Sequence, residues 1–324
     1  MIVLELTRVQ VFDEEIIASW LQEFTDSRKD MSPRMIDWVM DELHWKADIL
    51  QKTDQIVAFD SGVVKSDTRI SEELKQALKD VVRPLEDIPQ EEKDYHPDSE
   101  KRVVDLVHPS LFPVIYGRTR ILPGRVIGLD DCLASVGQGD VLEVPPAAQA
   151  VCPEYGLGSQ KGDVGLEPYS RKFQWLPCDV EAVGDGSKCR IASYINNLHP
   201  HEHRGLYKVI GKLLDRIIPL WDTALRCVQM EYTRITSDEE EEANGGLYDR
   251  YPAQKMKRPV KQLKPRRFKP PRLPPSRRVN LRQKLRERGL QVIVKLANVE
   301  LTPTRPDYEG DSWCMEGRLV SNLP

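Results

Sequence analysis

The most regular alternation of apolar and polar residues in the chain lies at residues 290–301. From Leu290 to Leu296, apolar side chains recur at every second position, with Gln291 and Lys295 between them. A period of two is typical of a β-strand with one buried face. Pro303 and Pro306 follow, and neither can donate a backbone hydrogen bond to a sheet. The pattern therefore predicts one long strand, whose buried face carries Leu290, Val292, Val294 and Leu296.

Helical periodicity dominates the first ninety residues. Asp13 is the predicted N-cap of a first helix, because its carboxylate can accept hydrogen bonds from free amides of the first turn. Pro33, at a first helical position, opens a second helix that extends through Leu50. A third helix begins at Ser71. It is expected to stop before Pro84, because proline interrupts the helical hydrogen bonds.

The middle of the chain combines short strands with one strongly amphipathic helix. Pro200 is the predicted start of that helix, whose apolar residues from Leu206 to Ile218 recur on one face. Pro219 is expected to break or kink it, with a further helix from there to Met230. Turn residues between apolar runs predict two hairpins: residues 56–65, turning at 60–62, and residues 173–195, with strands 173–180 and 189–195 around a turn at 184–186.

These elements predict an α+β protein with a helical N-terminal unit and a β-rich part with packed helices. The segment before the long strand is poor in apolar residues and rich in proline and charge, which favours disorder. The predicted division is a helical domain at 1–90, the first part of the core at 91–235, a disordered insertion at 236–288, and the strand with its following motif at 289–324.

Composition excludes a membrane-spanning class. The chain has no apolar run of eighteen residues, and its first residues lack the basic start and apolar centre of a signal peptide. The six cysteines are scattered without a C-x-x-C pair, which is typical of reduced thiols. We therefore expect a cytoplasmic or nuclear protein.

The net charge of −4 conceals a strong segregation. Residues 250–288 contain sixteen Lys and Arg and a single acid, Glu287, for a local charge of +15, so the remainder carries −19. Such a segment can contact nucleic acid or an anionic membrane surface. It holds two aromatic residues only, so base stacking is not indicated, and a solvated insertion is the alternative. The partners of the chain are otherwise unknown.

Three histidines and a glutamate form the densest group of potential metal ligands: His199, His201, Glu202 and His203. On a helix that starts at Pro200, residues two apart point about 200° from each other and cannot share one ion. Only His199 and His203 are four apart. The alternatives are a zinc or iron site and a polar helix start.

Cys314 and Glu316 stand two residues apart after the long strand and a turn. On a strand, such residues point to the same side. A pair written H-x-D/E supplies two of the three ligands of non-haem iron(II) oxygenases, and here a cysteine stands in place of the histidine. The alternative is that Cys314 is a small buried apolar residue and Glu316 a solvated one.

Longer blocks of sequence carry a family resemblance. Residues 289–317, which end in Trp313-Cys314-Met315-Glu316-Gly317, resemble the core of the fungal family known as domain of unknown function 4246. Its members read W-H-x-E-G at that point. Three further blocks match the family in the same order, so the resemblance spans most of the chain: Leu106–Pro113 with Tyr116–Arg120, Phe173–Cys178, and Ser193–Pro200.

The family is similar to iron(II)/2-oxoglutarate oxygenases on a jelly-roll barrel. The resemblance implies Fe(II) and 2-oxoglutarate as cofactors, with Glu316 and Cys314 at metal positions. Arginines of the block that contains His108, Tyr116, Arg118 and Arg120 can hold a carboxylate such as 2-oxoglutarate. Structural salt bridges are the alternative for these arginines.

The chain departs from the family in two respects. Cys314 replaces the histidine, and the strands that carry a second histidine and an arginine are absent. We therefore expect a shortened, catalytically impaired relative of these oxygenases that binds neither cofactor, with no catalytic residue assigned. The alternative is a binding or scaffold protein that uses the basic segment 250–288.

Overall fold

The computed structural model describes residues 10–27, 33–58, 62–97, 99–147, 170–227, 268–271, 279–308 and 310. Its contacts divide the chain into two compact units. Unit 1 comprises Met1–Ser71 and Arg216–Leu281, and unit 2 comprises Glu72–Asp215 and Arg282–Pro324. Helices and small antiparallel sheets occur together, so the predicted α+β class is confirmed.

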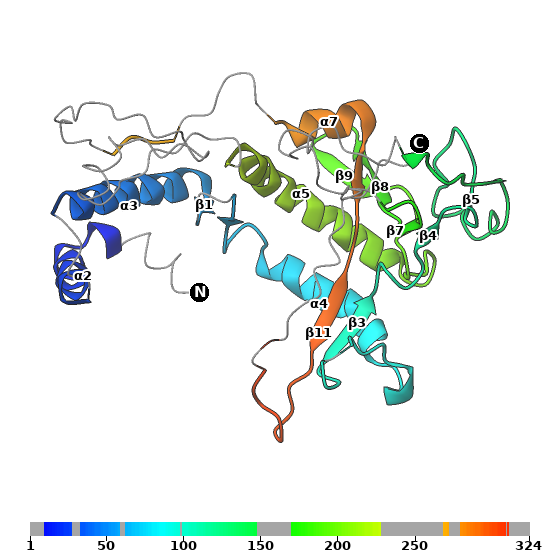
Figure 1. The fold of residues 1–324 in the computed structure, drawn as a ribbon, viewed down its shortest axis with the longest axis horizontal. Helices are drawn as coiled ribbons and strands as arrows, with labels where there is room; N and C mark the ends of the chain where they lie inside the picture. The colour runs from blue at the N-terminus through cyan, green and yellow to red at the C-terminus, as the bar shows by residue number, and fades with distance from the viewer. Residues whose placement is uncertain are drawn as a thin grey trace. The chain divides into compact units, whose positions relative to one another are not determined.

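Unit 1 begins with helices, as predicted. Asp13 caps α2 (Glu14–Ser27), with Oδ1 accepting hydrogen bonds from the amides of Glu15 at 3.0 Å and Ile16 at 3.2 Å. A 3-10 turn, η1 (Gln10–Phe12), precedes it, and α3 (Pro33–Thr53) follows (Figure 1). Strands β1 (Ile56–Val57) and β2 (Val64–Lys65) pair antiparallel, which confirms the predicted hairpin.

An aromatic cluster in unit 1 involves the charged insertion. Trp38 on α3 is buried, and its ring meets Phe268 edge-on with centroids 5.6 Å apart. Trp45 lies 5.8 Å from the same ring. Phe268 belongs to the segment predicted as a disordered insertion, and the structure places it against α3. Most of 236–288 lies outside the described residues, so its disorder stays a prediction.

Unit 2 holds most of the strands. The described strands form one three-stranded sheet, in the order β10-β8-β9, and the two-stranded pairs β11-β3, β4-β7 and β5-β6. No closed barrel is present among the described residues. In chain order, unit 2 contains α4 (Glu72–Glu86), η2 (Gln90–Glu92), β3 (Val103–Val107), β4 (Val114–Ile115), β5 (Arg120–Ile121), β6 (Asp140–Val141), β7 (Phe173–Gln174), β8 (Cys178–Val183), β9 (Lys188–Ile191), the first half of α5 (Arg204–Cys227), α7 (Leu281–Arg288), β10 (Leu290–Val292) and β11 (Leu296–Val299).

The prediction of a single strand at 290–301 is wrong, because the structure has two strands there. β10 pairs with β8 and β11 pairs with β3, so residues 293–295 pass from one sheet to another (Figure 1). The alternation of the sequence persists through both, with Gln291 and Lys295 exposed. Periodicity specifies a face at each position, but it carries no information on which neighbour supplies the hydrogen bonds.

Two proline predictions also need correction. α4 continues through Pro84 to Glu86 instead of stopping before it. A proline this close to the end of a helix removes a single hydrogen bond, so the last turn survives. Pro200 does not open the amphipathic helix. Residues 199–203 form a turn in which the amide of His203 bonds to the carbonyl of His199 at 3.1 Å, and α5 starts at Arg204.

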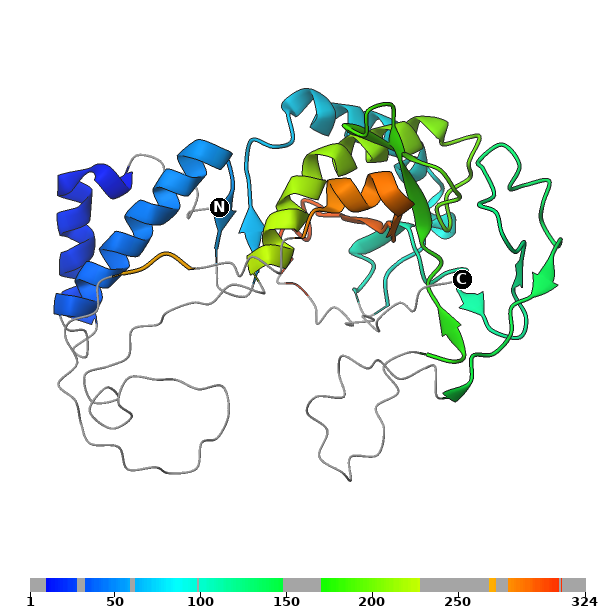
Figure 2. The same ribbon diagram turned by 90° about the horizontal axis from the view of Figure 1, so that it is seen from above.

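α5 buries the predicted apolar stripe, including Leu206 and Ile218, and runs past Pro219 to Cys227. In unit 2, α7 lies alongside it (Figure 2), and Arg282 Nη1 donates to Asp215 Oδ1 at 3.0 Å. α7 itself falls within the predicted insertion. Gly289 then closes α7 with a φ of +72°, in the left-handed region that favours glycine, and a Cβ there would lie 2.9 Å from the carbonyl oxygen of Val180. Among the described residues, no helix combines the length and apolar content needed to cross a membrane.

The β8–β9 hairpin turns at Gly184 and Gly186 as predicted and carries two buried thiols. Cys178 Sγ donates to the carbonyl of Val292 on β10, and Cys189 Sγ donates to the carbonyl of Gly211 on α5. Burial raises the pKa of the Cys178 thiol to about 12, and it raises the pKa of the Cys189 thiol to about 12 as well.

These thiols predict a loss of stability in alkali. An unfolded thiol titrates at about pH 8.5, so the unfolded chain loses protons there that folded Cys178 and Cys189 keep up to about pH 12. Folding stability is therefore fully present below that window and declines as pH rises through it. Thermal unfolding measured from about pH 8 to about pH 10 should show the decline. The double variant Cys178→Ala/Cys189→Ala should show a shallower one, and equal slopes would contradict the assignment.

Candidate functional site

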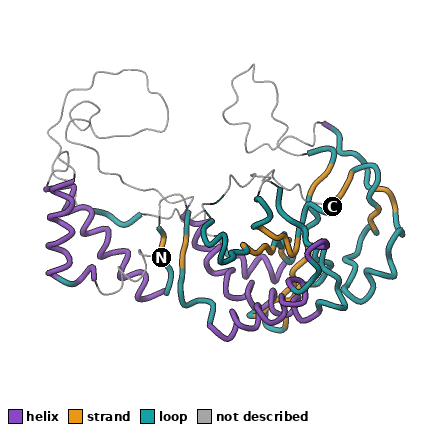
Figure 3. The backbone as a smooth tube through the Cα atoms, turned by 90° about the horizontal axis from the view of Figure 1, so that it is seen from below, coloured by secondary structure: helices purple, strands orange, loops and turns teal. Residues whose placement is uncertain are grey.

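A cavity of about 1300 Å³ lies within unit 2. Its walls come from β4, β5, the segment between β5 and β6, the connection from β7 into β8, and residues 193–203 before α5. Much of this part of unit 2 is loop interrupted by short strands (Figure 3). Ligand sites on loops that a sheet and a helix hold in place are common in enzymes and binding proteins.

The lining combines apolar side chains with an excess of positive charge. Arg118, Arg120 and Arg125 line it, whereas Asp179 is the single acidic residue that the described part of the chain contributes to the lining. The Asp179 carboxylate already accepts a hydrogen bond from Ser193 Oγ at 3.0 Å. The cavity is therefore suited to a small organic anion, whose carbon skeleton would contact apolar residues such as Ile121, Leu122 and Leu176.

A tight turn positions the first two arginines. Thr119 Oγ1 accepts a hydrogen bond from the amide of Ile115 at 2.9 Å, and Gly117 takes a φ of +79° between them. Arg120 Nη1 donates to the carbonyl of Gly139 at 2.8 Å. Gly139 has a φ of +88°, and a Cβ there would lie 2.1 Å from the carbonyl oxygen of Ile121. The β5–β6 pair therefore requires glycine at this position.

Arg118 is the arginine most available to a ligand. Its side chain makes no hydrogen bond or ion pair within the described part of the chain, while Arg120 has committed one donor to Gly139. A guanidinium has five N–H donors in a planar fork and binds carboxylates through two of them.

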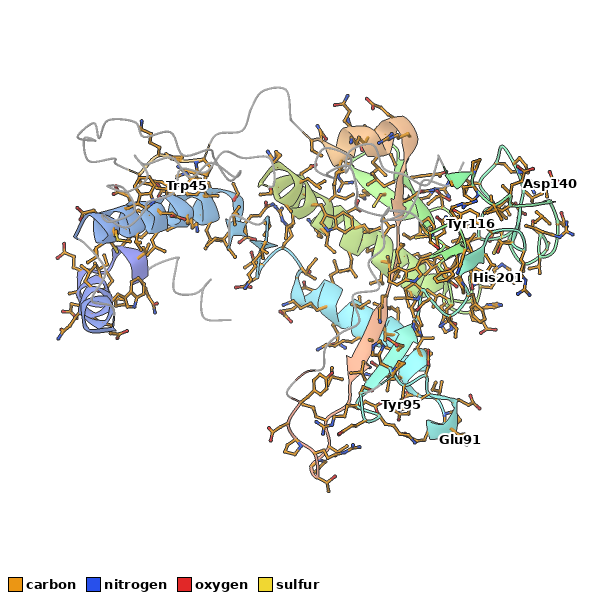
Figure 4. All side chains as sticks on the ribbon, in the orientation of Figure 1. Trp45, Glu91, Tyr95, Tyr116, Asp140 and His201 are labelled. Atoms are coloured by element: carbon orange, nitrogen blue, oxygen red, sulfur yellow. The ribbon has the colours of Figure 1, made fainter. Side chains whose placement is uncertain are left out.

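The histidine cluster is divided by the turn at 199–203. His199 and His203 line the cavity, while exposed His201 (labelled in Figure 4) is not part of the lining. His199 Nδ1 accepts a hydrogen bond from the amide of Glu202 at 3.2 Å. Among the described residues, the side chains close enough together to bind one metal ion are those of Asp94, Asp105 and His108. The four residues of the histidine cluster do not form such a group.

The block of His108, Tyr116, Arg118 and Arg120 is also divided. Arg118 and Arg120 line the cavity. Tyr116 is buried behind it, in an apolar cluster with Val114 and Leu142, and its hydroxyl donates to Gln174 Oε1 at 3.0 Å. His108 lies in a separate cluster with two aspartates.

Sequence reasoning missed several residues of the cavity wall. Asp179, Ser193 and Tyr194 line it, yet each occurs in the sequence as an ordinary strand or turn residue. The sequence did contain one indication of their role, because Ser193 and Tyr194 belong to the family block Ser193–Pro200. Cys314 and Glu316 lie outside the described residues, so the predicted metal pair stays a prediction. The same holds for a nucleic-acid role of segment 250–288.

Comparison with known families gives one result that covers most of the chain. The family model described as "Protein of unknown function (DUF4246)" matches residues 33–322. No curated protein and no solved structure matches the chain.

Proposed function

This chain belongs to the DUF4246 family of proteins of unknown function, and we propose that it binds a small organic anion in the unit 2 cavity, with 2-oxoglutarate as the first candidate. The observation that carries the proposal is the imbalance of charge in the lining. Three arginines line the cavity, and the one carboxylate among its described lining residues is already hydrogen-bonded. An anion bound there would neutralise positive charge that no other acid of the described lining offsets.

The composition of the lining supports a dicarboxylate over a mineral anion. Arginines, histidines and apolar residues line the same cavity, so a ligand that combines charged groups with a carbon skeleton matches the lining. On this proposal, Arg118 holds one carboxylate with its free guanidinium, and His199 and His203 offer further polar groups to the ligand from the same lining.

The resemblance to iron(II)/2-oxoglutarate oxygenases adds a reason for this ligand. In such enzymes iron and 2-oxoglutarate together supply the oxidising chemistry. Here a thiol at position 314 stands where the family has an imidazole, which changes the charge and softness of the ligand set. We therefore place the chain among anion-binding relatives of these oxygenases whose turnover is impaired.

Isothermal titration of the full chain with 2-oxoglutarate, in the presence of a chelator, tests the proposal. We expect saturable binding that Arg118→Gln weakens by about tenfold or more, because a charge-assisted hydrogen bond contributes about 1.5–3 kcal/mol. The matched control is Arg83→Gln, which removes the same charge from an exposed position on α4 outside the cavity.

The dimethyl ester of 2-oxoglutarate separates charge recognition from apolar packing. It should bind at least about tenfold more weakly than the diacid if the arginines hold carboxylates. Equal binding by wild type and Arg118→Gln, or equal loss in Arg118→Gln and Arg83→Gln, would contradict the assignment of the site.

A further inference from the structure

A group of potential metal ligands, distant in sequence from the predicted metal pair, lies on β3 and beside it. Asp94, Asp105 and His108 place one oxygen or nitrogen atom each within 4.8 Å of one another. His108 Nδ1 lies 2.7 Å from Asp94 Oδ2 and 3.7 Å from Asp105 Oδ2. His96 borders this group of three, with Nδ1 at 3.0 Å from Asp105 Oδ2. We call these four residues the Asp–His cluster.

The local fold forces the two carboxylates together. Residues 94–96 run antiparallel to β3 through the bridge of Tyr95 with Val104, and the amide of Asp105 bonds to the carbonyl of Asp94 at 2.8 Å. Asp94 and Asp105 are therefore directly opposite each other. Tyr95, which separates Asp94 from His96, is seen next to β3 in Figure 4. Like charges directly across a strand pair are destabilising unless a cation offsets them.

Burial raises the free-energy cost of placing two carboxylates side by side. The Asp105 side chain has no exposed area and interrupts an otherwise apolar buried strand. Its Oδ1 accepts no hydrogen bond among the described residues, and the ammonium of Lys295 lies 3.4 Å away. One lysine balances one of the two carboxylates, so the group keeps a net charge of about −1 when both histidines are neutral. Buried carboxylates are normally paired or bound to metal.

We propose that the Asp–His cluster binds a divalent transition-metal ion, with zinc as the reference ion. The imidazole of His108 and the carboxylates of Asp94 and Asp105 form a donor set that suits zinc and iron(II), with a solvent molecule to complete the coordination. Ligands of one zinc ion lie about 3 to 4 Å apart, because each is about 2.0 to 2.2 Å from the metal. The observed spacings need only small side-chain movements to reach that range.

Metal binding here would exchange protons for the ion. The His108 imidazole, where it carries a proton on Nδ1 towards a carboxylate, would release it to solvent and bind the metal through the freed nitrogen. No oxidation or reduction is involved. Lys295 would keep its contact with Asp105 Oδ1 and fix the orientation of the carboxylate, while Asp94, at 42% side-chain exposure, gives the ion a route from solvent.

Equilibrium dialysis of the full chain against zinc, with the bound metal measured by mass spectrometry, tests this site. We expect one bound equivalent in wild type. Asp94→Asn and His108→Gln should each weaken binding by about tenfold or more, because each removes a ligand. Asp94→Asn is the safer variant for folding, since that side chain is partly exposed and the amide keeps its shape.

Two controls separate this site from the other candidates. His201→Gln alters an exposed histidine of the 199–203 turn, and Cys314→Ala/Glu316→Gln removes the pair that the family resemblance implies. Both should retain the zinc of wild type. Cobalt in place of zinc should give visible absorption with nitrogen ligation, which His108→Gln should diminish. Zinc that is lost in a control but kept in Asp94→Asn, or no zinc on the folded protein, would overturn the proposal.

Discussion

The variant Asn196→Asp should lose about 3–5 kcal/mol of folding free energy, because a buried charge is left without a partner. Asn196 is 3% exposed. Its Nδ2 donates to the carbonyl of Pro109 at 2.6 Å and to that of Phe112 at 2.9 Å. An ionised aspartate has the same size as asparagine but can only accept hydrogen bonds. The carbonyl oxygens of Pro109 and Phe112 would then face a carboxylate and lose their donor.

Urea unfolding followed by circular dichroism measures this effect. The neighbouring variant Asn197→Asp is the matched control, because Asn197 is only half-buried and aspartate also tolerates its φ of +60°. We expect a change within about 0.5 kcal/mol for the control. The penalty of Asn196→Asp should shrink in acid, since protonation removes the charge and supplies one donor. A penalty that is equal in both variants would show that the contact with residues 109–112 contributes little.

The second large effect is expected for Tyr207→Phe. The Tyr207 hydroxyl accepts a hydrogen bond from the amide of Ile195 at 3.0 Å and donates to the carbonyl of Leu198 at 2.8 Å. It is buried, and burial raises the pKa of the phenol. Phenylalanine fills the same space but leaves both backbone groups unpaired, at a cost of about 1–3 kcal/mol for each group.

Tyr207→Phe should also affect the cavity, because residues 197–200 form part of its wall. We expect weaker 2-oxoglutarate binding together with a lower unfolding midpoint. Tyr194→Phe provides the comparison. The Tyr194 hydroxyl is half-buried and accepts one hydrogen bond, from the amide of Asn197. We therefore expect Tyr194→Phe to lower the free energy of unfolding by about half as much as Tyr207→Phe, or less. A midpoint unchanged by Tyr207→Phe would contradict the role assigned to the hydroxyl.

The local elements were predictable from the sequence wherever a short-range rule decides. The cap at Asp13 depends on residues within three positions, and the hairpin around Gly184 and Gly186 depends on turn residues. The division at 293–295 was not predictable, since it depends on β8 and β3, which lie more than a hundred residues earlier in the chain. Pro200 misled because a proline that suits a helix start suits a turn equally well.

The candidate site was predictable only in part. Arg118 and Arg120 were identified through the family block, and the structure adds that they share a cavity with His199 and His203. The same block suggested a common role for His108, which instead contacts Asp94 and Asp105. Asp105 gave no signal, because a single acid within Val103–Val107 looks like the exposed position of a strand. Residues 94–96 and β11 pair with β3 along both of its edges, so β3 is a central strand with all five residues buried.

The passage of the chain between two sheets at residues 293–295 has a consequence for how the sequence can vary. In one continuous strand, an inserted or deleted residue moves every later side chain to the opposite face. Here β10 and β11 keep separate registers, with β8 and with β3. A change of one residue in length at 293–295 would leave both ladders intact, whereas the same change inside β10 or β11 would not. Relatives that differ in length in this region should differ at this connection.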